Sequence, residues 1–144
     1  MTKLILLLVA AVLAAGAGTA SASDQAARST VTARTSAYGK ILFDGSGRAL
    51  YAFTRDPRRR SVCAGACAKA WPPYVVTGRP KAATGVKASL LGTTKRAGGG
   101  TQVTYGGRPL YYYVGDQVGQ VRCQNVKEFG GLWLVVGPNG RLVR

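Results

Sequence analysis

Histidine is absent from this chain of 144 residues, and only five residues are acidic. Without an imidazole there is no Ser-His-Asp or Cys-His arrangement and no histidine general base. Glu128 and the four aspartates are too few to indicate a glycosidase pair. No glycine-rich phosphate loop stands between a strand and a helix. The sequence therefore favours a non-catalytic protein, and it predicts neither a cofactor nor a metal.

Long hydrophobic runs are also scarce, and the one present lies at the N-terminus. Lys3 precedes twelve uncharged residues, 4–15, and Ala20-Ser21-Ala22 follows. This order is typical of a Sec-type signal peptide, and the run is shorter than the roughly 20 residues that span a bilayer. An uncleaved anchor is the alternative. We expect residues 1–22 to be removed, and no cysteine near the cut offers a lipid attachment site. The protein is then secreted or associated with the cell envelope, with no transmembrane anchor.

Negative charge is scarce throughout. The sequence has 20 Lys and Arg residues against 5 acids. Loss of residues 1–22 removes Lys3 and leaves 122 residues with a net charge of +14. This charge could serve solubility alone, or attract an anionic partner such as a wall polymer, lipid head groups or extracellular nucleic acid. Nucleic acid is the least favoured, because no recognised binding motif is present. The candidates for a basic patch are Arg58, Arg59, Arg60, Lys95 and Arg96.

The sequence after the signal peptide contains an internal duplication. A shift of 60 residues without a gap places residues 39–76 over 99–136. The identical pairs include Gly47 and Gly107, Tyr51 and Tyr111, Asp56 and Asp116, and Cys63 and Cys123. We therefore expect a flexible leader over 23–30 and one domain over 31–144, with copies at about 31–90 and 91–144.

Each copy has the pattern of β structure. Apolar runs flank turn clusters at 44–47 and 106–107, which predicts two hairpins, and further strands are expected at 74–76 and 132–136. A strand begins near Val31, and residues 82–91 have room for one helical turn at most. Alternation places Tyr51 and Phe53 on one face of a strand and Leu50 on the other. The expected fold is all-β, a small sandwich or barrel-like domain with pseudo-twofold symmetry.

Several motifs in the two copies resemble a known family. Residues 50–56 read LYAFTRD and residues 61–73 read SVCAGACAKAWPP, while the second copy has YYYVGD at 111–116 and FGGLW at 129–133. These are similar to the secreted-repeat family marked by Tyr-x-(Phe/Trp/Tyr)-x-x-Asp, whose members are often described as predicted lipoproteins. The resemblance covers roughly residues 37–140. It implies export and a repeat, and it carries over no activity.

The motif residues have two interpretations. The aromatics could pack in the core or form a platform for a flat ligand such as a sugar, and packing is favoured. Asp56 and Asp116 could accept backbone N–H bonds in a turn or act as a carboxylate pair, and the turn is favoured. Trp71, before Pro72-Pro73, should pack its ring over the domain. The shift of 60 aligns Trp71 with Gly131, and Trp133 lies two positions further on, so the two tryptophans are similar in context but not equivalent. The candidate residues are Tyr51, Phe53, Asp56, Trp71, Tyr111, Tyr113, Asp116 and Trp133.

Three cysteines complete the candidates. Export favours a disulfide, and Cys63–Cys67 and Cys67–Cys123 are both possible, as is pairing of Cys123 between chains. Cys-x-x-x-Cys is not the Cys-x-x-Cys spacing of thiol oxidoreductases, and three thiolates without histidine make a poor metal site. The favoured function is a binding module for anionic envelope material. The alternative is a thiol-redox or metal-binding protein using Cys63, Cys67 and Cys123. The sequence leaves the ligand and the oligomeric state open.

Overall fold

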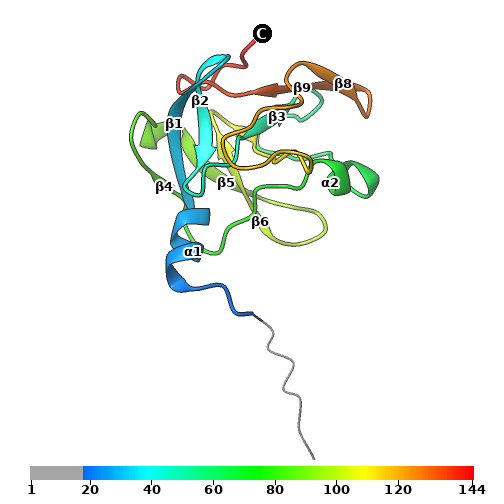
Figure 1. Cartoon of the computed structure of the whole chain (residues 1–144). Coiled ribbons are helices and arrows are strands. Elements are labelled where there is room, and N and C mark those ends of the chain that lie inside the picture. The colour runs from blue at the N-terminus through cyan, green and yellow to red at the C-terminus, as the bar shows by residue number, and fades with distance from the viewer. Residues whose placement is uncertain (1–17) are drawn as a thin grey trace, which may run out of the picture.

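The computed structural model describes residues 18–144, which form a β domain with two short α-helices (Figure 1). Residues 1–17, the larger part of the predicted signal peptide, lie outside the described residues. Within 18–144, no helix is long and apolar enough to cross a bilayer. The helix α1 (Ala22–Arg28) precedes the first copy, which contains β1 (Thr30–Ser36), β2 (Gly39–Asp44), β3 (Tyr51–Phe53), α2 (Ala66–Ala70), β4 (Lys81–Ala82) and the 3₁₀ turn η1 (Ala88–Leu90). The second contributes β5 (Leu91–Lys95), β6 (Thr101–Tyr105), β7 (Arg108–Pro109), β8 (Val126–Glu128) and β9 (Gly131–Val135).

The strands form three small sheets, ordered β2-β1-β4, β3-β9-β8 and β5-β6-β7. Isolated bridges join them, among them Tyr51 to Tyr111 and Val75 to Gln102. The all-β fold with tandem repeats is therefore confirmed. The hairpin predicted at 44–47 is only partial, because Phe43 bridges Ala49 while β3 pairs with β9. The strand predicted at 74–76 is likewise reduced to single bridges on either side of Tyr74.

The core consists of two hydrophobic clusters on opposite sides of β3. Tyr51 and Phe53 belong to one cluster, whereas Leu50 and Ala52 belong to the other. This is the alternation expected of a strand, and all four residues are buried. Because β3 is buried on both faces, its side chains are fixed by packing against residues of both copies.

Residues 23–30, expected to be a flexible leader, instead form most of α1 and lead into β1. Ser21 caps the helix, accepting a hydrogen bond from the Asp24 backbone N–H at 3.3 Å. The helix is held against the turn after β2, where the Gly45 N–H donates to the Ala27 carbonyl at 3.0 Å. A Cβ at position 45 would lie 2.5 Å from that carbonyl oxygen, so only glycine allows this approach.

Candidate functional site

Two motif tyrosines meet at the centre of the molecule. Tyr51 and Tyr111 exchange backbone hydrogen bonds, each N–H donating to the other's carbonyl at 2.9 Å. This is the reciprocal pattern of an antiparallel pair, and it relates residues 60 apart by a local twofold axis. The Tyr51 hydroxyl donates to Asp116 Oδ2 at 2.5 Å, and the Tyr111 hydroxyl donates to Asp56 Oδ2 at 2.6 Å. The tyrosine of each copy therefore binds the aspartate of the other copy.

The second oxygen of each aspartate closes a turn within its own copy. Asp56 Oδ1 accepts the Val62 N–H at 2.8 Å, and Asp116 Oδ1 accepts the Arg122 N–H at 2.9 Å. Burial raises the pKa of Asp56 and also the pKa of Tyr51 and Tyr111, since each charged form would be poorly solvated. Each aspartate is thus engaged by a tyrosine and a backbone N–H, as a turn-forming residue would be.

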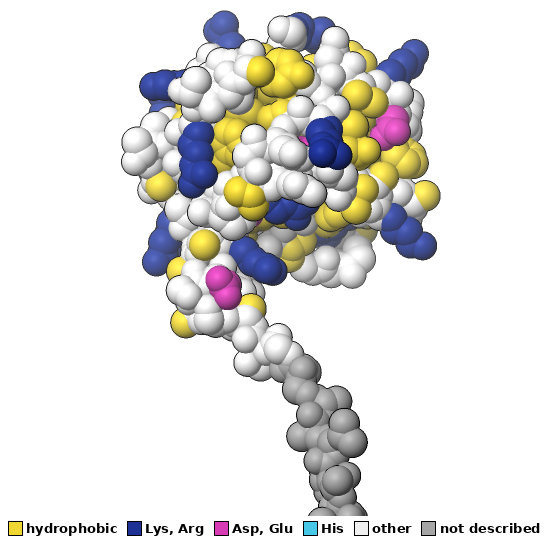
Figure 2. Space-filling model, in the orientation of Figure 1, with side chains coloured by type: hydrophobic (Ala, Val, Ile, Leu, Met, Phe, Trp, Pro, Cys, Tyr) yellow, Lys and Arg dark blue, Asp and Glu magenta, His cyan; other side chains and the backbone are white. Residues whose placement is uncertain are grey.

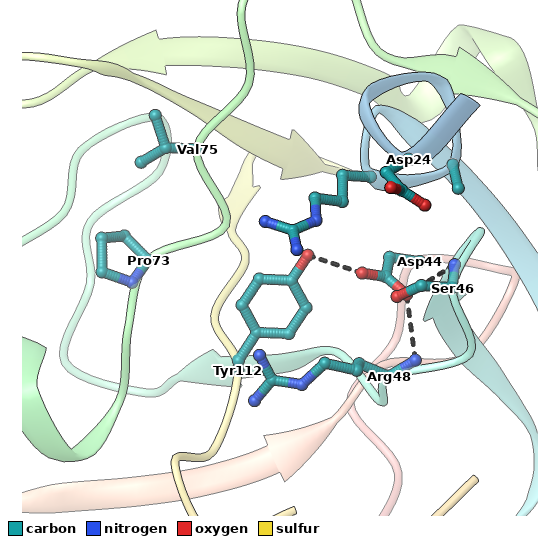
Figure 3. Close-up of a pocket in the computed structure, with 9 residues that line it drawn as sticks. Asp24, Asp44, Ser46, Arg48, Pro73, Val75 and Tyr112 are labelled. Carbon is teal, nitrogen blue, oxygen red and sulfur yellow. Dashed lines mark hydrogen bonds between the residues drawn. The ribbon is translucent and has the colours of Figure 1, made fainter. Parts of the chain in front are cut away.

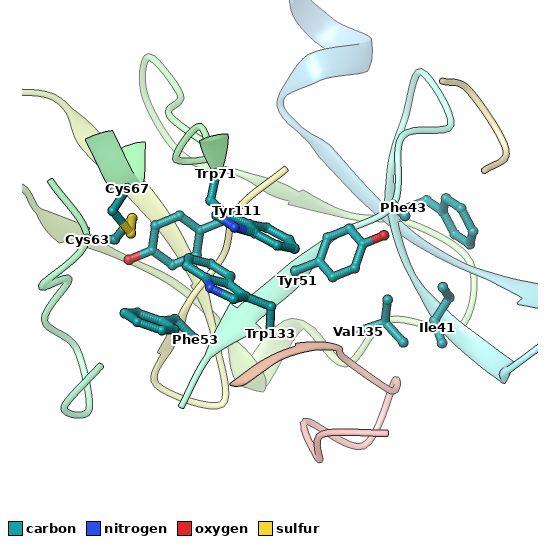
Figure 4. Packing of buried hydrophobic residues seen from close by; sticks show 11 residues of the cluster. Ile41, Phe43, Tyr51, Phe53, Cys63, Cys67, Trp71, Tyr111, Trp133 and Val135 are labelled. Atoms are coloured by element: carbon teal, nitrogen blue, oxygen red, sulfur yellow. A yellow bond between two sulfur atoms is a disulfide. The ribbon is translucent and has the colours of Figure 1, made fainter. Parts of the chain in front are cut away.

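The motif aromatics fill the space around this axis (Figure 4). The Trp71 and Trp133 rings stack with centroids 4.1 Å apart. Trp71 contacts Tyr51 edge-on and Tyr113 on a tilt, while Trp133 contacts Tyr111 edge-on and stacks on Phe53. All of these rings are buried except Tyr113, which is half-buried. They are therefore packed against one another rather than presented to a ligand.

The two tryptophans are equivalent, contrary to what the ungapped alignment indicated. Tyr111 bridges Pro73, and Tyr51 pairs with Val135, so the copies differ by 62 residues here. A two-residue insertion in the second copy restores the match of Trp71 with Trp133. One difference remains: Trp71 Nε1 donates to Glu128 Oε2 at 2.8 Å, whereas the buried Trp133 Nε1 has no hydrogen-bond partner among the described residues.

The sequence predicts a disulfide but leaves its pairing open, and the structure forms it between Cys63 and Cys67. It joins the loop after β3 to the first turn of α2, and both cysteines are buried. Cys123, the counterpart of Cys63, is a half-buried free thiol, and the second copy contains no other cysteine. In residues 18–144, no group of three or more Cys, Asp or Glu side chains is placed to hold a metal ion.

The two predicted basic clusters, 35 residues apart in sequence, come together in space. Thr94 Oγ1 of β5 donates to the Arg59 carbonyl, which holds the loop 58–60 against that strand. Arg58, Arg59 and Arg60 are exposed on this loop. Lys95 is also exposed, but it follows Thr94 along the strand, so its side chain points to the opposite face of β5, where Nζ donates to Thr101 Oγ1 at 2.9 Å. Arg96 is different, because it is half-buried and donates to Ser61 Oγ, Gln102 Oε1 and the Cys63 carbonyl. It connects loop and sheet, so the exposed basic surface on this face consists of the three loop arginines.

A scan against protein-family models matches residues 32–74 and 92–137 to one family, described as a secreted repeat of unknown function. The chain belongs to the secreted repeat family. The two matches coincide with the two copies, so the predicted resemblance is confirmed. Among curated proteins and among solved structures, none matches the chain.

The two secreted repeats differ most clearly at the basic loop. Arg59 has φ of 58°, in the left-handed region, and its counterpart 60 residues later is Gly119 with φ of 75°. A non-glycine residue in this conformation costs roughly 1–2 kcal/mol. The Arg59 N–H donates to the Gly107 carbonyl at 2.7 Å, and the Gly119 N–H donates to the Gly47 carbonyl at 2.8 Å. The backbone is thus the same in both repeats, and only the first carries a cation there.

Sequence reasoning missed a hollow of about 330 Å³ between α1 and the turn after β2 (Figure 3). Asp44 lies at its base, only 1% exposed, and accepts hydrogen bonds from the Tyr112 hydroxyl, the Ser46 hydroxyl and two backbone N–H groups. Arg48 lies over the Tyr112 ring, 4.3 Å from its centroid. Asp24 and Arg28 line the opposite wall. Asp44 and Ser46 lie in the turn cluster predicted at 44–47, and Tyr112 lies in the motif of the second copy, but nothing in the sequence indicated that these residues meet.

Proposed function

We propose that this secreted repeat protein is a non-catalytic module that associates with an anionic polymer of the cell envelope. The observation that carries the proposal is the segregation of charge. Three of the five acids, Asp44, Asp56 and Asp116, accept hydrogen bonds inside the fold. Asp44 and Asp116 are buried and Asp56 is half-buried. Only Asp24 and Glu128 are exposed acids.

The cations have the opposite distribution. Figure 2 shows Lys and Arg side chains around the whole outline of the visible face, with few acids between them. The excess of positive over negative charge is therefore greater on the surface than in the sequence as a whole. Such a field raises the local concentration of an anionic partner and speeds its encounter. Dispersed cations suit a long polymer with repeating charges better than a single small anion, and Arg58–Arg60 are three successive exposed cations among them.

Co-sedimentation of the mature protein with isolated cell envelope across a salt series tests the proposal. We expect retention at low salt and release as salt rises toward 1 M, where the screening length falls to about 3 Å. Envelope from which anionic polymers have been extracted is the matched control and should retain little protein. Retention that ignores salt, or no retention at the lowest salt, would contradict the proposal.

A further inference from the structure

Two hollows adjoin strand β5, which lies at the edge of its sheet. One, of about 220 Å³, lies between the loop carrying Arg58 and Arg59 and the turn Gly106-Gly107. The other, of about 350 Å³, contains Arg79 and is bounded by β4 and η1. Residues Leu91, Gly92 and Thr93 line both hollows. The two are thus neighbours along one strand edge.

Their charge sets them apart from the hollow near α1. Among the described residues, no acid lines either hollow, and each contains at least one exposed arginine. The hollow near α1 contains two aspartates as well as two arginines. An anion at the edge of β5 would therefore be near arginines and would not be repelled by a carboxylate lining either hollow.

The internal symmetry provides a second argument. Arg58 and Arg59 correspond to Val118 and Gly119 in the other repeat. A Cβ at Gly107 would meet the Arg58 guanidinium at 3.0 Å, and a Cβ at Gly47 would meet both Val118 and the Arg34 guanidinium at 3.0 Å, so the two positions are matched in space. The loop of the first repeat supplies a cation of its own here, whereas the loop of the second repeat has an apolar side chain and the nearby cation comes from β1. The first repeat also keeps Arg59 in a backbone conformation that glycine adopts more easily. Nothing in the packing of the fold requires either arginine, because the second repeat forms the same turn without them.

We propose that these hollows bind a phosphodiester-linked polymer lying along the edge of β5. One phosphate lies between Arg58 and Arg59, and a later one lies beside Arg79. Guanidinium groups match the paired oxygens of a phosphate, which a single ammonium group does not. This inference rests on the proposed function and adds to it a site and a class of polymer. An extended peptide pairing with β5 is the competing occupant. It would bind through backbone hydrogen bonds and would not require Arg58, Arg59 and Arg79, which have no acidic residue beside them in the two hollows.

The test compares affinities for a short poly(glycerol phosphate) and a poly-L-glutamate of equal charge, measured by fluorescence anisotropy at fixed salt. The mature protein should bind the phosphodiester at least tenfold more tightly. Arg58→Gln with Arg59→Gln should abolish that preference, and Arg79→Gln should weaken phosphodiester binding further. The matched control is Arg122→Gln with Lys127→Gln, which removes two exposed charges elsewhere and should preserve the preference. The slope of log affinity against log salt should fall by about one for each arginine–phosphate pair that a substitution removes.

Arg59→Gly provides a variant that cannot act by unfolding the protein. It copies Gly119, so its melting temperature should be unchanged or higher while phosphodiester affinity falls. The site would be overturned if the protein bound both polymers equally and if the Arg58→Gln, Arg59→Gln variant and its Arg122→Gln, Lys127→Gln control lost affinity by the same factor. The proposed function would still stand in that case. Failure to bind either polymer would overturn both. Binding of a neutral extended peptide that displaces the phosphodiester and ignores Arg58 and Arg59 would also overturn it, in favour of strand pairing.

Discussion

Replacing Tyr51 with phenylalanine removes the hydroxyl that joins the first repeat to the second. The ring remains and still meets Trp71 edge-on, so packing is preserved. Asp116, which is 7% exposed, then keeps only the Arg122 N–H as a hydrogen-bond donor. A hydrogen bond to a charged group contributes about 1.5–3 kcal/mol, and leaving a buried carboxylate without its partner adds to that loss. We expect Tyr51→Phe to lower the free energy of unfolding by about 3 kcal/mol.

The symmetric change Tyr111→Phe should cost less, about 1.5 kcal/mol, although it removes two hydrogen bonds, one to Asp56 Oδ2 at 2.6 Å and one with Ser61 Oγ at 2.7 Å. Asp56 and Ser61 are half-buried, so water can replace part of the hydroxyl's role. Asp56 is also stabilised by the charge of Arg96. A smaller cost for Tyr111→Phe, in spite of the additional bond, would show that local burial rather than the number of hydrogen bonds sets the cost.

Urea unfolding followed by tryptophan fluorescence is the assay, because Trp71 and Trp133 lie at the same centre. Tyr38→Phe, at an exposed ring, is the control and should change stability by less than about 0.5 kcal/mol. A double-mutant cycle of Tyr51→Phe with Asp116→Asn should show a coupling of about 2 kcal/mol. A cost below about 1 kcal/mol for Tyr51→Phe, or a larger cost for Tyr111→Phe, would refute the reasoning.

Three further predictions concern other parts of the fold. Burial raises the pKa of four tyrosines above that of tyrosine in an unfolded chain, which is about 10; they are Tyr51, Tyr74, Tyr111 and Tyr112. The free energy of unfolding should therefore be constant below pH 10 and fall above it, by up to about 1.4 kcal/mol per pH unit for each tyrosine. Urea midpoints measured from pH 8 to 11.5 should show this decrease, and a constant midpoint would contradict it. Replacing Cys63 and Cys67 by serine should cost about 2 kcal/mol, since the disulfide closes a short loop; the measure is again the urea midpoint, and loss of the whole fold would contradict so small a cost. Phe129 has φ of 53° at the tip of the β8–β9 hairpin, so Phe129→Asn should raise stability by about 1 kcal/mol, and a lower melting temperature would count against strain at that turn.

Much of the fold could be predicted because its signals are local or repeated. Alternation along residues 50–53 gave the correct face for Tyr51, and the 60-residue shift located both copies. The pairing between copies could not be predicted, because a repeat has the same pattern whether its tyrosine binds its own aspartate or its partner's. The equivalence of Trp71 and Trp133 was missed for a related reason: an ungapped comparison cannot see a two-residue insertion that the backbone absorbs in a loop.

The candidate site depended more heavily on three-dimensional contacts. The cations at 58–60 and 95–96 could be identified from the sequence, but only the contacts of Thr94 and Arg96 show that the loop 58–60 lies against β5. Arg96 could not be distinguished from its exposed neighbour Lys95, because its role comes from three acceptors distant in the chain or on another strand. Asp44 and Tyr112 are 68 residues apart in the sequence, and no pattern in it indicated that the Tyr112 hydroxyl donates to Asp44.

The crossed tyrosine–aspartate bonds have a consequence for how such a chain can change over time. A single repeat would leave its tyrosine and its aspartate without partners, so it would need a second copy of itself to complete the same core. In that symmetric dimer, every substitution would occur twice. Joining the copies in one chain removes this constraint, since one half can then be altered while the other continues to supply the missing contacts. The pair Arg58 and Arg59 opposite Val118 and Gly119 is such a one-sided change. In a joined chain, one half can therefore carry a new feature while the crossed bonds to the other half are kept.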